Sequence, residues 1–274
     1  MTTPTRPQPT PQTALVVSPS ATVSVGPVVR SWMLAVAAFG LCGLLPPIAQ
    51  PQDYHAFAAA HAWGGLEDAG NVLSNLAFLA VALWGALRLA RLQRLTPPSG
   101  SAAVHAAAWT LVAGLVLTAG GSAWYHATPS DQSLVWDRLA MVLSFAAVLA
   151  LSLQRGGPSR GTPTVLLPLT AFGCAAVALW VATGNLTPYL VLQVGGTLFI
   201  GAQALCGQHR RGAFPAAAVF AWYGTAKLLE HFDALVAEVT HGLVAGHPLK
   251  HLAAAIAAGV ILHAYLRAAL PDRP

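Results

Sequence analysis

Apolar residues dominate the chain in long runs that are separated by short polar stretches. Each of eight such runs is close to the roughly 20 residues that an α-helix needs to cross a bilayer. They lie at 31–49, 71–92, 103–125, 133–154, 163–183, 187–206, 212–235 and 247–268. Residues 1–29 are instead rich in Pro, Thr, Ser and Gln, which predicts a disordered tail. The pattern predicts an all-α integral membrane helical bundle.

The first run differs from the others in the residues at its C-terminal end. Its core, "WMLAVAAFGLCGLL", precedes Pro46, Pro47 and a stretch of small residues. Such a segment is typical of an uncleaved helix or of a signal peptide with its cleavage site. We expect an extra transmembrane helix at 30–49, with the signal-like segment as the alternative. A seven-helix domain at 50–268 and a short tail at 269–274 complete the predicted organisation.

Composition supports the membrane class. Charged residues make up 8% of the chain and hydrophobic residues 55%, whereas about a quarter of the residues in soluble domains are charged. The net charge of +5 raises the question of a nucleic-acid partner. The basic residues are scattered singly between apolar runs, however, which is typical of the loops of a membrane protein. We therefore expect an integral membrane protein with no nucleic-acid partner.

The loops predict an orientation. One predicted face carries the arginines Arg6, Arg30, Arg88, Arg91, Arg94, Arg155, Arg160, Arg210, Arg211, Arg267 and Arg273. The opposite face carries Asp53, Glu67, Asp68, Asp131 and Glu238, with Lys250 at a helix start. Because cytoplasmic loops are enriched in Lys and Arg, both termini are predicted to be cytoplasmic. The acidic face is then external or lumenal.

Polar residues with helical spacing gather on that external face. Ser122 and His126 in "SAWYH" share one helix face, and so do His247 and His251 in "HPLKH". Three imidazoles with a water are the common form of a catalytic zinc site, and zinc lowers the pKa of that water to about 7. Asp137 would then move a proton to a leaving group, and Ser122 would donate a hydrogen bond to an oxyanion. The alternative is that the histidines only pack or lie at the membrane interface.

Three stretches carry a resemblance to a known family. "GGSAWYHATPSDQSLVWDRLAM", "GNVLSNLAFL" and "GHPLKHLAAA" resemble the signature motifs of the alkaline ceramidases, which belong to a superfamily of seven-helix membrane hydrolases that includes the adiponectin receptors. The resemblance covers about residues 53–268. It implies Zn²⁺ on the three histidines and hydrolysis of a ceramide-like lipid amide to fatty acid and amine. The residues that match the family's site are Ser122, His126, Asp137, His247 and His251.

The chain departs from this family at two points. Lys250 stands where members usually carry Trp. Eukaryotic members also hold Ca²⁺ ahead of their first core helix, and Asp53, Glu67, Asp68 and Asn71 would supply part of such an oxygen site. The acidic run between them is replaced by "YHAFAAAHAWGG". The alternative is that Asp68 caps the helix at 71–92 while Asp53 and Glu67 are solvated loop charges.

Further charged residues lie close to the predicted site. Lys227 and Glu230 are three residues apart, so they can pair on one helix face, either as a structural ion pair or as a wall that binds a lipid headgroup. Lys250 adds positive potential beside two of the histidines and favours a substrate with an anionic headgroup, or the product carboxylate.

These observations predict a zinc-dependent membrane hydrolase that cleaves the amide bond of an N-acyl lipid. One alternative is a receptor or transporter with a structural zinc site, and another is a zinc-dependent lipid esterase. A structural zinc site closes its fourth position with protein and needs neither Asp137 nor Ser122.

Overall fold

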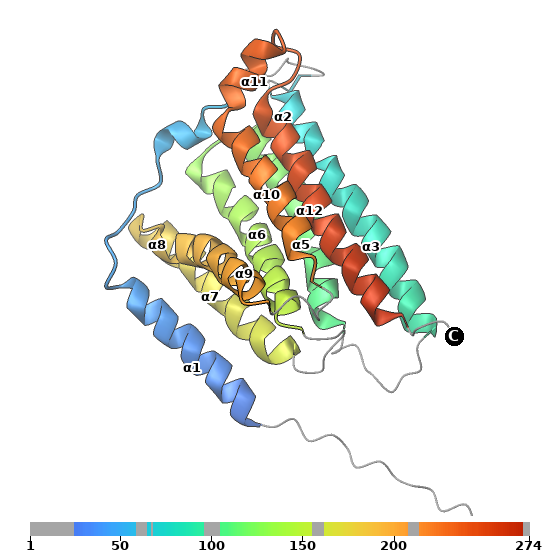
Figure 1. Cartoon of the computed structure of the whole chain (residues 1–274). Helices are drawn as coiled ribbons and strands as arrows, with labels where there is room; N and C mark the ends of the chain where they lie inside the picture. Colours follow the sequence, from blue (N-terminus) through green and yellow to red (C-terminus); the bar gives the residue numbers. More distant parts are fainter. Residues whose placement is uncertain are drawn as a thin grey trace, which may run out of the picture.

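The computed structural model describes residues 25–58, 65–66, 68–95, 105–154, 162–207 and 214–270, which are mainly helical and contain no strand. The helices run back and forth along one bundle (Figure 1). Their bounds are α1 Val25–Cys42, the 3-10 turn η1 Gln52–His55, α2 Ala69–Ser74, α3 Leu76–Leu95, α5 Ala106–Ala127, α6 Asp131–Ser152, α7 Thr162–Thr183, α8 Thr187–Leu190, the π-helical turn η3 Val191–Gly195, α9 Gly196–Leu205, α10 Ala216–His231, α11 Asp233–Val239 and α12 Gly246–Ala269.

Six helical segments of the described chain are long and apolar enough to cross a membrane. They are Ala69–Leu95, Ala106–Ala127, Asp131–Ser152, Thr164–Thr183, Thr187–Leu205 and Gly246–Ala269. Large apolar side chains such as Leu83, Leu87 and Leu198 are exposed on the outside of the bundle, where lipid would cover them. The predicted all-α membrane bundle is confirmed.

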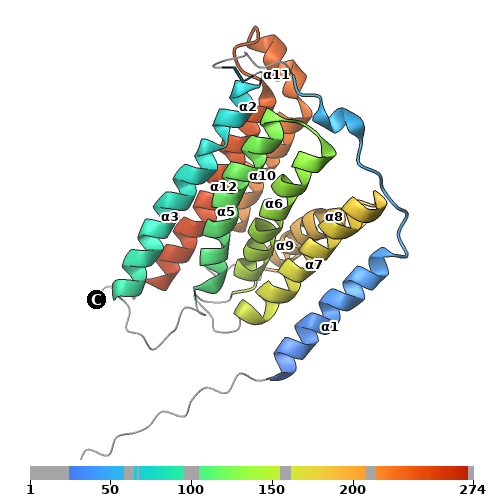
Figure 2. The same ribbon diagram turned by 180° about the vertical axis from the view of Figure 1, so that it is seen from behind.

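The two remaining predicted spans form shorter helices. The run at 31–49 gives α1, which begins at Val25 inside the predicted tail and ends at Cys42, ahead of Pro46 and Pro47. The run at 212–235 gives α10, which has 16 residues and is followed by the short helix α11. Figure 2 shows α1 lying beside α7, at the edge of the bundle.

Two predicted spans are interrupted where polar side chains compete with the helix. The run at 71–92 breaks at Asn75, whose side-chain amide donates to the backbone oxygen of Asn71 at 2.8 Å. Side-chain bonds of this kind offer the backbone an alternative to a regular helix. The run at 187–206 contains η3, and Gln193 within it accepts a hydrogen bond from Thr197 through its backbone oxygen.

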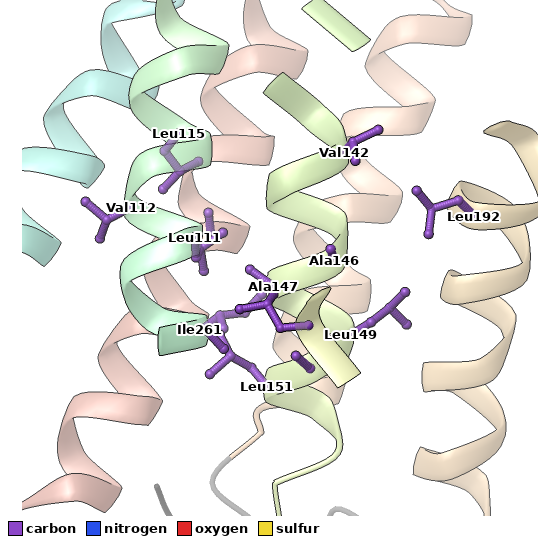
Figure 3. Packing of buried hydrophobic residues seen from close by; sticks show 14 of the residues in the cluster. Leu111, Val112, Leu115, Val142, Ala146, Ala147, Leu149, Leu151, Leu192 and Ile261 are labelled. Atoms are coloured by element: carbon purple, nitrogen blue, oxygen red, sulfur yellow. The ribbon is translucent and has the colours of Figure 1, made fainter. Parts of the chain in front are cut away.

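The core lies between α5, α6 and α12. Leu111 and Leu115 of α5 face α6 residues such as Ala146, and Ile261 of α12 closes the same cluster (Figure 3). Small residues on α6 let the helices approach closely, which is how membrane helices gain packing energy.

The two ends of the bundle differ in the segments that they carry. The N-terminal end of α1 and the C-terminal end of α12 lie toward one end (Figure 1). The α5–α6 turn, α2 and α11 lie at the opposite end, which is also where α12 begins. Because the two ends of the helical chain lie at the same end of the bundle, the chain would cross the membrane an even number of times. The cytoplasmic placement of the termini stays a prediction.

Candidate metal centre

Three histidines meet at the end of the bundle that is remote from the termini. His126 lies in the last turn of α5, and His247 and His251 lie in the first two turns of α12. One ring nitrogen from each lies within 4.8 Å of the others, and the residues are only 2%, 5% and 3% exposed. A metal ion needs three or more histidine, cysteine or acidic side chains that lie close together. In the described part of the chain, these three histidines form such a group.

Two glycines bring the histidine-bearing helices into place. A Cβ on Gly121 would lie 2.9 Å from the backbone oxygen of Trp136, so only glycine lets α5 approach α6 this closely just before Ser122. A Cβ on Gly246 would lie 2.1 Å from the backbone oxygen of Leu229, so α12 begins directly against α10. Gly121 of "GGSAWYH" and Gly246 of "GHPLKH" are therefore explained by close backbone contact at the site.

The imidazole of His251 is oriented by a hydrogen bond. Its Nδ1 lies 2.7 Å from the hydroxyl of Ser74, and Ser74 itself donates to the backbone oxygen of Asn71 at 3.0 Å. In the tautomer in which the Ser74 proton goes to Asn71, His251 Nδ1–H donates to Ser74, and Nε2 keeps a lone pair for a metal. Metal-binding histidines usually donate their other ring N–H in this way.

The other two histidines differ in their partners. His126 Nδ1 is buried and has no hydrogen-bond partner, an arrangement that a metal ion would satisfy. His247 Nε2 lies 2.8 Å from the ammonium of Lys250, which also contacts Glu230 Oε1 at 2.9 Å. Lys250 would withdraw toward Glu230 if His247 bound a metal through Nε2. Three buried imidazoles fit Zn²⁺ in ligand type and number.

An aromatic ring covers the histidines. The ring centre of Phe57 lies 4.6 Å from those of His126 and His247. The segment that carries Phe57 is fastened by Asp233, which accepts from the backbone N–H of Ala58 at 2.9 Å and of His247 at 2.6 Å. Phe57 and Ala58 thus cover the histidine group on this side.

Asp137 and Ser122 lie beside the histidines. Both are buried, and the Ser122 side chain is a close polar neighbour of the Asp137 carboxyl. The α5–α6 turn fixes their relation, because Ser130 caps α6 by accepting from Ser133 N–H at 3.1 Å, and Ser133 donates to the backbone oxygen of Thr128 at 2.6 Å.

A cavity of about 460 Å³ connects these polar groups with the interior of the bundle. Ser122, Asp137 and the three histidines line its polar end. Leu111, Leu149, Ile200 and Ile261 line the apolar remainder, and its volume lies in the range of ligand-binding cavities.

Of the residues predicted for calcium, Asp68 and Asn71 are in contact with each other. Asp53 lies exposed in η1, and Glu67 lies outside the described residues. Asp68 accepts a hydrogen bond from the side-chain amide of Asn71 at 2.6 Å, and its side chain makes no capping bond to α2. Burial raises the pKa of the Asp68 carboxyl. Asp68 Oδ1 and Asn71 Oδ1 are buried without a hydrogen-bond partner.

The charged residues of α10 form a short network. Lys227 Nζ lies 2.7 Å from Glu230 Oε2, and Lys250 contacts the other carboxylate oxygen of Glu230. All three residues line the cavity. One carboxylate therefore pairs with two ammonium groups.

Sequence reasoning gave Phe57 and Arg138 no role, and it expected Ser74, in "SNL" at 74–76, only to hold helices together within the membrane. Ser74, Phe57 and Arg138 act through contacts with distant parts of the chain. Only Arg138 gave a signal, as a charge in an apolar run directly after Asp137.

The fold and the histidine group define a multi-pass helical membrane protein with a candidate metal centre. Comparison of the chain with models of protein families, with curated proteins and with solved structures found no match.

Proposed function

We propose that this protein is a zinc-dependent membrane hydrolase that cleaves the amide bond of a ceramide-like N-acyl lipid. The observation that carries the proposal is that three buried imidazoles share one cavity with a buried aspartate side chain and a serine. The motif resemblance to the alkaline ceramidases supports the same assignment. A receptor or transporter with structural zinc is the weaker candidate, because it gives Asp137 and Ser122 no role.

The residues divide into two groups by role. His126, His247 and His251 would hold the zinc ion, which supplies Lewis acidity and an activated water when it is bound. Asp137 takes up a proton from the attacking water and delivers it to the leaving nitrogen. Ser122 donates a hydrogen bond to the oxygen of the scissile carbonyl as negative charge develops there.

A lipid substrate suits the position of the cavity. Trp124 and Trp136 stack with ring centres 6.1 Å apart, and both are exposed beside the site. Exposed Trp side chains favour the level of the lipid headgroups. A substrate at that level would place its polar bond at the histidines and its acyl chain in the apolar part of the cavity. By the arginine distribution, we place this end at the external or lumenal face.

Calcium stays a prediction. The partnerless oxygens of Asp68 and Asn71 are suited to a hard cation, whereas Asp53 is exposed some distance along the chain. Calcium would then act through the loop before α2 and not in the hydrolytic step.

The direct test is hydrolysis by the purified protein. A panel of ceramide, other N-acyl amines and matched fatty esters is incubated with the protein, with and without a zinc chelator, and released fatty acid is measured. Release from amides that stops with the chelator and returns with added Zn²⁺ is expected. Release from esters alone would favour the esterase, and no release from any lipid would contradict a hydrolase.

A further inference from the structure

Arg138 is a buried charge whose close contacts are all with neutral groups, while the carboxyl groups of Asp137 and Asp131 act on it only at longer range. The residue is 5% exposed and lines the cavity. Its guanidinium lies 4.0 Å above the ring of Trp180 and 5.1 Å from that of Tyr189, and Nη2 donates to the side-chain oxygen of Gln50. Nη1 is buried and has no hydrogen-bond partner.

Such an arrangement is costly in the absence of an anion. A buried charge needs an opposite charge and full hydrogen bonding to offset its desolvation. The ion pairs of the described residues do not include Arg138. Aromatic faces and one amide oxygen stabilise the guanidinium only in part.

The charged side chains that line the cavity include more cations than carboxyl groups. Its charged side chains are the cations Arg138, Lys227 and Lys250 and the carboxyl groups Asp137 and Glu230. Both lysines contact Glu230, and Asp137 has Ser122 as a close polar neighbour. Arg138 is thus the cation without a carboxylate contact, and a bound metal ion would increase the positive excess further.

The place of Arg138 indicates which part of a substrate it would meet. It follows Asp137 directly on α6, and Asp137 is the group that we assign to the leaving nitrogen. A group held by Arg138 therefore belongs to the amine half of the substrate, while the acyl half occupies the apolar part of the cavity. Nη2 already donates to Gln50, whereas Nη1 has no partner. The N–H groups of Nη1 can therefore donate to a compact anion such as a carboxylate.

We propose that Arg138 binds a carboxylate on the amine half of the substrate, and that the substrate class is the N-acyl amino acids. This assignment rests on the proposed hydrolase function. Hydrolysis breaks the bond between the acyl carbon and the nitrogen. The acyl carbon gains the hydroxyl of water and the nitrogen gains its proton, so a fatty acid and a free amino acid leave.

The first experiment compares two substrates that share an acyl chain. N-oleoylglycine carries the carboxylate and N-oleoylethanolamine does not. We expect the wild-type protein to hydrolyse N-oleoylglycine with a kcat/KM roughly 10- to 100-fold higher, the size of one charge-assisted contact. Arg138→Gln should abolish this preference, because it lowers kcat/KM for N-oleoylglycine far more than for N-oleoylethanolamine. Arg91→Gln removes an exposed arginine on α3 and is the matched control, with the preference unchanged.

The variants separate recognition from a structural role. Arg138→Lys keeps the charge and is the second test if Arg138→Gln fails to fold, and it should keep part of the preference. An equal loss for both substrates in the variants would show that Arg138 only supports the fold, and a wild-type preference for the neutral amide would overturn the proposal.

The second experiment does not depend on turnover. Protein treated with a chelator is heated with N-oleoylglycine or with N-oleoylethanolamine, and the shift of the unfolding temperature reports binding. A larger shift with N-oleoylglycine that disappears in Arg138→Gln supports the anion site even if no amide is hydrolysed. Equal shifts with both compounds would overturn the anion site and leave the hydrolase proposal standing.

Discussion

A methyl group at Gly121 would press α5 against the α6 backbone beside the site. The added Cβ would lie 2.9 Å from the backbone oxygen of Trp136 and 3.3 Å from the amide nitrogen of Asp137. Ordinary contact begins at 3.4 Å, so Gly121→Ala forces the helices about 0.5 Å apart. Gly120 is the matched control, because a Cβ at this position meets nothing within 4 Å.

The two substitutions should change stability in opposite directions. Alanine gains about 1 kcal/mol of helix propensity over glycine at either position. Overpacking at Gly121 costs about 1–3 kcal/mol, so Gly121→Ala should lose about 0–2 kcal/mol while Gly120→Ala gains about 1 kcal/mol. A displacement of about 0.5 Å at Asp137 should also slow turnover about tenfold, since roughly 1 Å can cost 10²-fold.

The assay measures unfolding temperature, zinc content and hydrolysis rate on the same preparations in detergent. We expect Gly121→Ala to keep its zinc, because the contact falls on Asp137 and not on a histidine. Equal stability and equal turnover for the two variants would refute the close approach of α5 and α6.

Three further predictions concern the surroundings of the site. Ser74→Ala removes the acceptor of His251 Nδ1–H, so zinc affinity should fall about 10- to 100-fold in a competition titration; unchanged affinity would contradict the orienting role. Lys250→Met frees His247 Nε2 and should tighten zinc binding about tenfold, whereas Lys227→Met, which does not touch a histidine, should leave it unchanged. A C-terminal reporter should be active only on the cytoplasmic side, and activity outside would reverse the predicted sidedness.

The sequence predicted the fold well where the length of an apolar run alone determines that the segment forms a membrane-spanning helix. A run of about 20 apolar residues can satisfy its backbone in lipid only as a helix, so the spans at 103–125 and 133–154 match α5 and α6 closely. The break at Asn75 and the π-helical turn at Val191–Gly195 were not predicted. Both depend on side-chain and packing contacts that hydropathy does not describe.

For the site, too, only local features could be predicted from the sequence. Residues four apart on one helix, such as His247 and His251, were recognisable because their spacing is local. Ser74 meets His251 across 177 positions of the chain, and Gln50 meets Arg138 across 88. Only the folded bundle brings such partners together, so the orienting serine and the unpaired guanidinium could not be predicted.

Zinc content measured beside hydrolysis rate tests the central claim most directly. Alanine variants of His126, His247 and His251 are compared with Asp137→Asn and Ser122→Ala by elemental analysis and by turnover of the same N-acyl lipid. Each histidine variant should lose zinc and activity together, because two imidazoles hold the ion too weakly. Asp137→Asn should keep zinc while turnover falls about 10²–10⁴-fold, and Ser122→Ala should keep zinc with a loss of about 10²–10³-fold. Full zinc in all three histidine variants, or undiminished turnover in Asp137→Asn, would contradict the account.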